Sequence, residues 1–252
     1  MVWISKLKGH LDSVYCKPQA VNVDEYIRAN FPPSAFTALK LLPSHIVNSE
    51  PLYALLDGFR TDVEFKTCSE SPIRDEEDLE LYASRVASTV GELCLDLVFH
   101  HTGHKANKAM LYSSAKQMGI ALQYINIARD VSVDAQIGRV YLPRTWLTEE
   151  GLTSESVLLE EQERISGNRR GHSPEIDRMR RRLLGKAFER YRASRPSMGM
   201  IPAQARGPMI VAVESYMEIG RVLAEGGLRV EGKATVPVTR RIGVVWKNLL
   251  KN

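Results

Sequence analysis

The sequence is poor in cysteine and contains no CxxC pair. Its three cysteines, Cys16, Cys68 and Cys94, are an odd number and lie far apart. This pattern argues against a disulfide framework and favours a reducing compartment. Cys94 stands in an apolar helical run, so we expect it in the core. The sequence therefore predicts an intracellular protein.

The sequence also has no long apolar run. No stretch approaches the roughly 20 apolar residues that a membrane-spanning helix needs. The first residues, MVWISKLKGHLDSV, contain no apolar region like that of a signal peptide. We therefore expect a protein that is soluble or that meets a membrane only at its surface.

Charge of one sign is scarce as well. Lys and Arg number 34 against 30 Asp and Glu, for a formal charge of +4. The basic runs 169–170 and 180–182 have no aromatic residues between them, so they indicate solvated helix faces. We expect no nucleic-acid partner, although the slight basic excess suits an anionic substrate or an anionic membrane.

Alternation of apolar and polar residues, which would indicate strands, is missing, and helical spacing dominates. The sequence predicts an all-α fold in one domain over residues 1–252. An example of the helical spacing is the run Leu79, Tyr82, Val86, Val90, Leu93 and Leu97. The principal helices are expected over residues 22–31, 51–65, 79–101, 107–135, 173–194, 202–225 and 238–250, with a polar connection over 153–172.

The expected helix 107–135 is apolar on most faces, which indicates a central position. Gln123, Asn126, Asp130 and Asp134 nevertheless follow one another at steps of three, four and four, so they form one polar stripe. Two carboxylates on a buried helix repel each other and lose hydration. A cation would relieve both costs, and Asn and Asp oxygens suit Mg²⁺ beside a phosphate. Ordinary salt bridges from Arg129 or Arg139 are the alternative.

The stripe resembles a known motif. Residues 122–134, LQYINIARDVSVD, followed by GRVYLP over 138–143, are similar to the second aspartate-rich motif of squalene and phytoene synthases, QxxNxxRDxxxD…GRxYxP. Residues 82–91 (YASRVASTVG) and 55–62 (LLDGFRTD) resemble two further segments of that family. GRVYLP and WLTEEGL over 146–152 look most like fungal phytoene synthases, which are commonly fused to a membrane-embedded lycopene cyclase domain.

The resemblance implies an isoprenoid synthase helical bundle around a large apolar cavity. It implies a Mg²⁺-dependent head-to-head condensation of two geranylgeranyl diphosphates to phytoene, with Mn²⁺ as an alternative metal and without NADPH. The metal ligands would be Asn126, Asp130 and Asp134. The resemblance assigns catalysis or binding of prenyl diphosphate to Tyr82, Gln123, Arg129, Arg139, Tyr141, Tyr216 and Lys233. We expect helices with Tyr82, Val86, Val90 and Leu122 to line the prenyl pocket.

The family pattern also has a first DxxxD motif, on a helix expected before Trp3, and that motif is absent from this sequence. Asp75 and Asp78 lie in an acidic run, but their place at a helix start indicates dipole-complementing residues. Ser88 stands where the family often has Gly, and Lys233 takes the approximate place of an Arg. We therefore expect a fold without its first helices, and a chain that makes little or no phytoene alone.

Two alternatives remain open at this stage. The chain could be a non-catalytic family member that acts in protein assembly, as some mitochondrial relatives do; loss of the metal motifs marks that group, whereas the second motif is intact here. His100, His101 and His104 could suggest a transition-metal site. Their spacing, however, does not place three ligands on one helical face, and His also suits a helix C-terminus.

Overall fold

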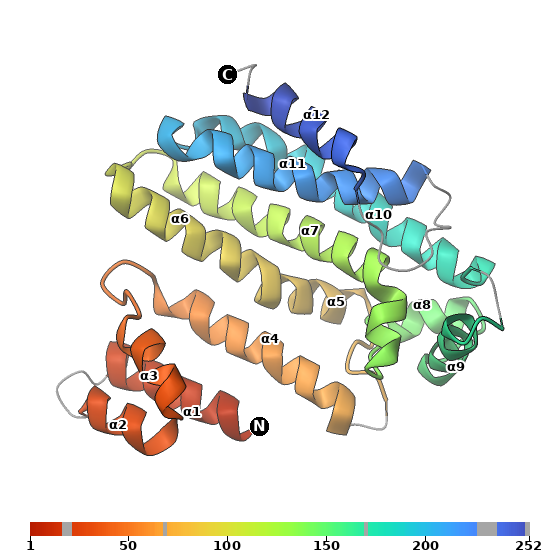
Figure 1. Ribbon diagram of the computed structural model, residues 1–252, viewed down its shortest axis with the longest axis horizontal. Helices are drawn as coiled ribbons and strands as arrows, with labels where there is room; N and C mark the ends of the chain where they lie inside the picture. Colours follow the sequence, from red (N-terminus) through yellow and green to blue (C-terminus); the bar gives the residue numbers. More distant parts are fainter. Residues whose placement is uncertain (17–21, 68–69, 169–170, 226–235, 250–252) are drawn as a thin grey trace.

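The computed structural model describes residues 1–252 except 17–21, 68–69, 169–170, 226–235 and 250–252, which are grey in Figure 1. The described residues form helices and no strand, which confirms the all-α prediction. The α-helices are α1 Val2–Leu11, α2 Val23–Asn30, α3 Pro33–Lys40, α4 Ser49–Thr67, α5 Glu76–Ala83, α6 Thr89–Thr102, α7 Lys108–Gln136, α8 Arg144–Glu149, α9 Ser154–Ile165, α10 Pro174–Ser194, α11 Ala203–Glu225 and α12 Val238–Leu249.

Helix α7 runs through the middle of the molecule (Figure 1). It contacts α5 and α6 on one side and α10 and α11 on the other, while α9 packs near its C-terminal end. Helix α4 lies beyond α5 and α6, and α1 to α3 gather beyond α4. Helix α12 packs on α11 as the outermost helix on the opposite side. No helix built from the described residues is long and apolar enough to cross a membrane.

The central position of α7 follows from its composition. Its buried residues point in several directions around the helix, so each neighbouring helix finds an apolar surface to pack on. Tyr124 and Ile125 are fully buried in the main core. They pack with residues of several other helices, among them Leu79, Trp146, Leu183 and Met217. The prediction of a central helix over residues 107–135 is confirmed.

The predicted long helix ending near residue 101 is interrupted at its middle. Residues Ser84–Ser88 form a short π-helical segment between α5 and α6. A Cβ on Gly119 of α7 would lie 2.5 Å from the Cα of Ser88, so glycine allows the backbones to approach closely here. The Ser88 hydroxyl donates to the Lys116 carbonyl at 2.7 Å. Ser88 therefore bonds across a crossing where two backbones lie close together.

The polar region 153–172, predicted as a connection, contains helix α9. Thr153 and Ser156 form a reciprocal capping box at its start. Only Val157 and Glu161 of this helix are buried, so its apolar face is too small to signal a helix from sequence. The Glu161 carboxylate accepts hydrogen bonds from Arg164 at 2.8 Å and pairs with His172 at 2.5 Å. Burial opposes ionisation, but these partners lower the pKa of Glu161 to about 2.

Two other sequence-based expectations are wrong. Arg180, expected on a solvated face, is buried: its Nε donates to the Ala128 carbonyl of α7 at 2.7 Å, and its Nη1 pairs with Asp177 at 3.0 Å. A guanidinium can be buried when its donors are satisfied in this way. Cys94, expected in the core, is exposed and lines an open apolar cavity.

Candidate active site

The polar stripe of α7 is half-buried and tightly connected. The Arg129 guanidinium donates from Nε to Asp130 Oδ1 at 2.7 Å and from Nη2 to Asp130 Oδ2 at 2.5 Å. Its Nη2 also donates to Asn126 Oδ1 at 2.9 Å, and Asn126 Nδ2 donates to Gln123 Oε1 at 3.3 Å. The salt bridge considered as an alternative for Asp130 is therefore present, because Arg129 binds both of its carboxylate oxygens.

Helix α11 brings Tyr216 to the same stripe. The Tyr216 hydroxyl donates to Asn126 Oδ1, and the Arg129 guanidinium carbon lies 6.0 Å from the centre of the Tyr216 ring. Asn126 thus accepts hydrogen bonds from Arg129 on its own helix and from Tyr216 on α11. Tyr216 lies 90 residues from Asn126 in the sequence but contacts the stripe in the structure.

Asp134 is the uncompensated carboxylate of the stripe. Among the described residues its side chain forms no ion pair, in contrast to Asp130. Burial raises the pKa of Asp134 to about 7; the negative charges of Asp130 and Asp62 add to the rise, and Arg139 and Arg129 oppose it. A half-buried carboxyl group with so high a pKa is a candidate functional group.

Asp62 of α4 is the centre of a second polar cluster, and sequence reasoning did not include it among the site residues. Its Oδ1 accepts hydrogen bonds from the hydroxyls of Tyr82 at 2.9 Å and Tyr141 at 2.8 Å. Arg139 Nη1 lies 3.0 Å from the Tyr141 hydroxyl and 3.8 Å from Asp62 Oδ2. The one available signal was its place at the end of the segment LLDGFRTD, which resembles a family segment.

The two tyrosines of this cluster support each other. The Tyr82 and Tyr141 rings stack with centres 5.0 Å apart and planes 23° apart. Burial is the main reason why the pKa of each hydroxyl is raised well above the usual value. Both hydroxyls therefore stay protonated and act as donors. Tyr82, Arg139 and Tyr141, predicted from the resemblance, lie together around a carboxylate that also raises the pKa of Asp134.

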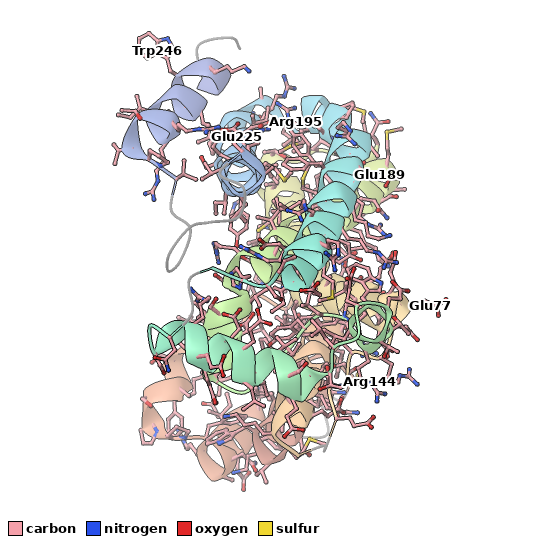
Figure 2. The ribbon with its side chains drawn as sticks, turned by 90° about the vertical axis from the view of Figure 1, so that its right-hand side faces the viewer. Glu77, Arg144, Glu189, Arg195, Glu225 and Trp246 are labelled. Carbon is pink, nitrogen blue, oxygen red and sulfur yellow. The ribbon has the colours of Figure 1, made fainter. Side chains whose placement is uncertain are left out.

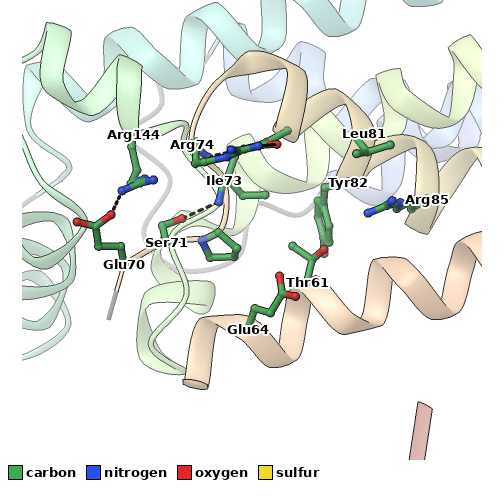
Figure 3. A pocket seen from close by; sticks show the side chains of 12 residues that line it. Thr61, Glu64, Glu70, Ser71, Ile73, Arg74, Leu81, Tyr82, Arg85 and Arg144 are labelled. Atoms are coloured by element: carbon green, nitrogen blue, oxygen red, sulfur yellow. Dashed lines mark hydrogen bonds and ion pairs between the residues drawn. The ribbon is translucent and has the colours of Figure 1, made fainter. Parts of the chain in front are cut away.

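A polar cavity of about 510 Å³ opens beside this cluster. Figure 3 shows the Tyr82 ring pointing from α5 toward α4, with Thr61 and Glu64 on α4 facing it. The cavity is lined by charged groups of both signs, and the guanidiniums of Arg74 and Arg144 pair with Asp78 and Glu70.

A separate, apolar cavity of about 340 Å³ lies between α6, α7 and α11. Val90 and Leu122 line it, as expected from sequence. Tyr82 instead lines the polar cavity, and Val86 packs on the main core. The expectation that these four residues share one pocket is therefore wrong for Tyr82 and Val86. The π-helical segment at 84–88 accounts for the difference, because it changes the helical register between Tyr82 and Val90.

The remaining predicted positions add no residue to the stripe or to the Asp62 cluster in the described chain. Lys233 lies outside the described residues. His100 and His101 contact each other edge to face, His104 stacks on Phe99, and the described chain has no group of three His, Cys, Asp or Glu side chains arranged to hold a metal. Asp75 caps α5 by accepting from the Asp78 amide at 2.9 Å, as its position at a helix start indicated.

The donor set of the stripe fits a magnesium ion in its chemistry. Asn126, Asp130 and Asp134 offer one amide oxygen and two carboxylates, and Mg²⁺ typically takes one or two carboxylates with water and substrate phosphate. Asp134 is free of ion pairs within the described chain, whereas Asp130 is held by Arg129. Metal binding at both carboxylates would therefore compete with the Arg129 pair.

Comparison with known proteins decides the family. The squalene/phytoene synthase family model matches residues 1–241. The chain belongs to this family. It is 53% identical to a bifunctional lycopene cyclase/phytoene synthase of Colletotrichum graminicola, and the match covers 99% of this chain and 42% of that protein. It is 48% identical to the Neurospora crassa protein of the same description, over 98% of this chain and 43% of that protein.

Solved structures of the squalene/phytoene synthase fold agree with the architecture. A dehydrosqualene synthase in complex with ligand superposes with a TM-score of 0.69 at 20% identity, covering 99% of this chain and 85% of that one. Squalene synthase HpnC from Alicyclobacillus acidocaldarius gives 0.62 at 18% identity, over 88% of this chain and 81% of that one. The predicted isoprenoid synthase fold is confirmed. The chain spans less than half the length of the fungal relatives.

Proposed function

We propose that this chain is of the phytoene synthase type, a prenyltransferase of carotenoid biosynthesis whose reaction joins two geranylgeranyl diphosphates head to head, and that with only the second aspartate-rich motif in its sequence it makes little phytoene alone. The observation that carries the proposal is the half-buried carboxyl group of Asp134 on the stripe of α7, which forms no ion pair in the described chain although Arg129 and Arg139 are near. Family membership and the fungal relatives, named bifunctional lycopene cyclase/phytoene synthases, support the choice of reaction.

In this proposal Asn126, Asp130 and Asp134 hold Mg²⁺, with Mn²⁺ as an alternative. The metal, when bound, supplies positive charge that stabilises the departing diphosphate. Arg129 and Arg139 add fixed cations beside the same group, and Gln123 and Lys233 belong to the proposed binding set. The hydroxyls of Tyr82 and Tyr141, kept protonated by burial and oriented by Asp62, are hydrogen-bond donors at the edge of the site.

The condensation would proceed through loss of one diphosphate to leave an allylic cation. Attack by the double bond of the second substrate, with loss of a proton, gives a cyclopropyl diphosphate. A second loss of diphosphate, rearrangement and proton loss give phytoene, so the electrons balance without NADPH. The apolar cavity lined by Val90, Met118 and Leu122 would hold a hydrocarbon tail.

The proposal extends to the surroundings of the enzyme. The substrate tails are lipid, so we include association with a membrane surface, and a lycopene cyclase domain as a fused partner, as in the fungal relatives. The cyclase is a property of those relatives and adds nothing to the site on α7.

The test is calorimetric titration with a non-hydrolysable geranylgeranyl thiodiphosphate, with and without Mg²⁺. We expect binding that depends on Mg²⁺ and is lost in Asp130→Ala and Asp134→Asn. Asp24→Asn is the control, because Asp24 is an exposed acid on α2 that pairs with Lys40. Binding that ignores Mg²⁺, or that survives Asp130→Ala, would contradict the proposal and favour a non-catalytic role in protein assembly.

A further inference from the structure

Helix α12 is amphipathic, but it presents its apolar face to solvent and its polar face to the rest of the protein. Val238, Ile242, Val245 and Trp246 are 67%, 60%, 38% and 70% exposed. Their spacing of four, three and one residues places them on one face of the helix. Figure 2 shows Trp246 on the outer side of α12, pointing away from the rest of the molecule. An exposed apolar stripe of this kind on an outermost helix marks an interaction surface.

Ion pairs explain why the polar face points inward. Arg240 donates from Nε to Glu218 Oε1 of α11 at 2.6 Å and from Nη1 to Glu225 Oε2 at 2.5 Å. Glu218 also pairs with Arg221 at 2.8 Å. Val244 is the half-buried apolar residue on this inner side. The ion pairs with α11 thus set the orientation of α12. In this orientation the polar face of the helix is paired with α11 and the apolar face points to solvent.

The charge of α12 indicates what covers this face. The helix has three basic residues and no acidic one. Arg240 and Lys247 line the side of α12 that faces α11. Arg241 lies at the edge of the apolar face, is exposed and forms no ion pair within the described chain. An apolar stripe with Trp, flanked by an unneutralised cation, suits an anionic bilayer surface, where indole lies at the headgroup level.

Two other occupants fit less well. A second copy docked through the same face would bring Arg241 of both chains to one interface, which is repulsive. Insertion across the bilayer is excluded by length, because 12 residues span only about 18 Å of the roughly 30 Å hydrocarbon core. The helix can lie in the plane of the surface instead.

We propose that α12 docks this protein on an anionic membrane surface through the face formed by Val238, Ile242, Val245 and Trp246, with Arg241 at the edge of that face beside the lipid headgroups. This names the surface for the membrane association in the proposed function, and it does not require the condensation activity. Docking would keep the protein beside the membrane from which a prenyl lipid is drawn.

The experiment is flotation of the protein with vesicles of phosphatidylcholine alone and of phosphatidylcholine with added phosphatidylserine, without substrate or metal. We expect binding to the anionic vesicles that weakens as salt rises, since screening shortens the range of the attraction. The double variant Ile242→Ser/Trp246→Ser should bind at least about tenfold more weakly. Leu41→Ser, at a side chain that is 72% exposed at the end of α3, should bind like the parent chain.

Further variants separate the contributions. Arg241→Glu keeps the apolar face and should weaken the preference for anionic vesicles. Trp246→Phe should bind but lose the blue shift of tryptophan fluorescence on vesicle addition. Absence of vesicle binding, or binding unchanged in Ile242→Ser/Trp246→Ser, would overturn the proposal. Dimerisation lost in that variant, seen by analytical ultracentrifugation without vesicle binding, would assign the face to a second copy. Titration with the thiodiphosphate analogue reports on the active site separately.

Discussion

Helices α7 and α12 break the usual amphipathic rule in opposite ways. Helix α7 is apolar on most sides and carries a polar stripe into the interior, whereas α12 carries an apolar stripe on its solvent side. In α7 the cost is the loss of hydration of charged groups. Asp130 is paired with Arg129, and the pKa of Asp134 is raised to about 7. In α12 the cost is exposed hydrocarbon, and the ion pairs of Arg240 fix the helix in that orientation.

The difference teaches what each violation indicates. A polar stripe inside a central helix is costly unless its charges are paired within the protein or by a ligand, so an unpaired carboxyl group such as Asp134 indicates a candidate ligand site. An apolar stripe on an outermost helix marks a surface that another apolar phase covers. The position of α7 is determined by packing on all sides, and the position of α12 by a few charged contacts. Four changes test this contrast, from the largest expected effect to the smallest.

The largest effect is expected for Asp134→Asn in metal-free protein. The pKa of Asp134 is about 7 in the folded protein and 3.8 in the unfolded chain. Below pH 3.8 the carboxyl group is protonated in both states, and as pH rises through 7 the folded state is progressively destabilised relative to the unfolded state. At pH 8 the ionised Asp134 lowers the stability of the parent, so the variant should have a free energy of unfolding higher by about 2–4 kcal/mol. The gain should shrink toward pH 5. Urea unfolding with a chelator at both pH values measures it.

Magnesium supplies the complementary arm of this prediction. At pH 8, Mg²⁺ should raise the melting temperature of the parent, because the ligand binds only the folded protein. The Asp134→Asn variant should show little of this rise. The exposed variant Asp24→Asn should follow the parent at each pH. If parent and Asp134→Asn had the same pH dependence, Asp134 would not be the uncompensated group of the stripe.

The next effect compares glycines on the two helices. In α7, a Cβ on Gly119 would meet the Ser88 backbone at 2.5 Å, so Gly119→Ala should lower the free energy of unfolding by about 1–3 kcal/mol. In α12, a Cβ on Gly243 meets nothing within 4 Å, so Gly243→Ala should raise helix stability by up to about 1 kcal/mol. Equal effects in chemical denaturation would contradict the claim that only α7 is fixed by close packing.

A smaller effect is expected at Tyr216, where α11 meets the stripe. Tyr216→Phe removes the hydrogen bond to Asn126 and should cost about 0.5–1.5 kcal/mol of stability. In a double-mutant cycle with Asn126→Ala, the two losses should not add, because they remove the same contact. Additive losses would show that Tyr216 stabilises the fold through its ring alone.

The elements that sequence predicted well are those whose signal is local. The stripe of α7 lies within one helix, so Gln123, Asn126, Asp130 and Asp134 could be found by spacing alone. Ser173 was a sufficient signal for the start of α10, where its side chain accepts from the Ile176 amide. Family resemblance added Tyr82, Arg139, Tyr141 and Tyr216, and the structure brings these residues to two adjoining clusters.

The parts that sequence missed depend on contacts between distant residues. Asp62 is recognised as a site residue only when Tyr82 and Tyr141, 20 and 79 residues away, converge on one carboxylate oxygen. Arg180 lies in a basic run that looks solvated, and its burial depends on a carbonyl 52 residues away. The π-helical segment at 84–88 leaves the apolar spacing of residues 79–97 helical, yet it separates Tyr82 from the cavity lined by Val90.

The smallest effect is expected for Arg240→Gln, which removes the ion pairs to Glu218 and Glu225. Glu225 is exposed, and the buried Glu218 keeps its ion pair with Arg221. Global stability should therefore change little, but α12 should be held less tightly on α11. Amide hydrogen exchange should become faster in α12 and remain unchanged in α7. Arg241→Gln is the matched control, since Arg241 donates only to the Val236 carbonyl at 2.9 Å in the described chain. High salt should reproduce part of the effect in the parent. Unchanged exchange in α12 of Arg240→Gln would show that apolar packing through Val244, and not charge, sets the orientation of this helix.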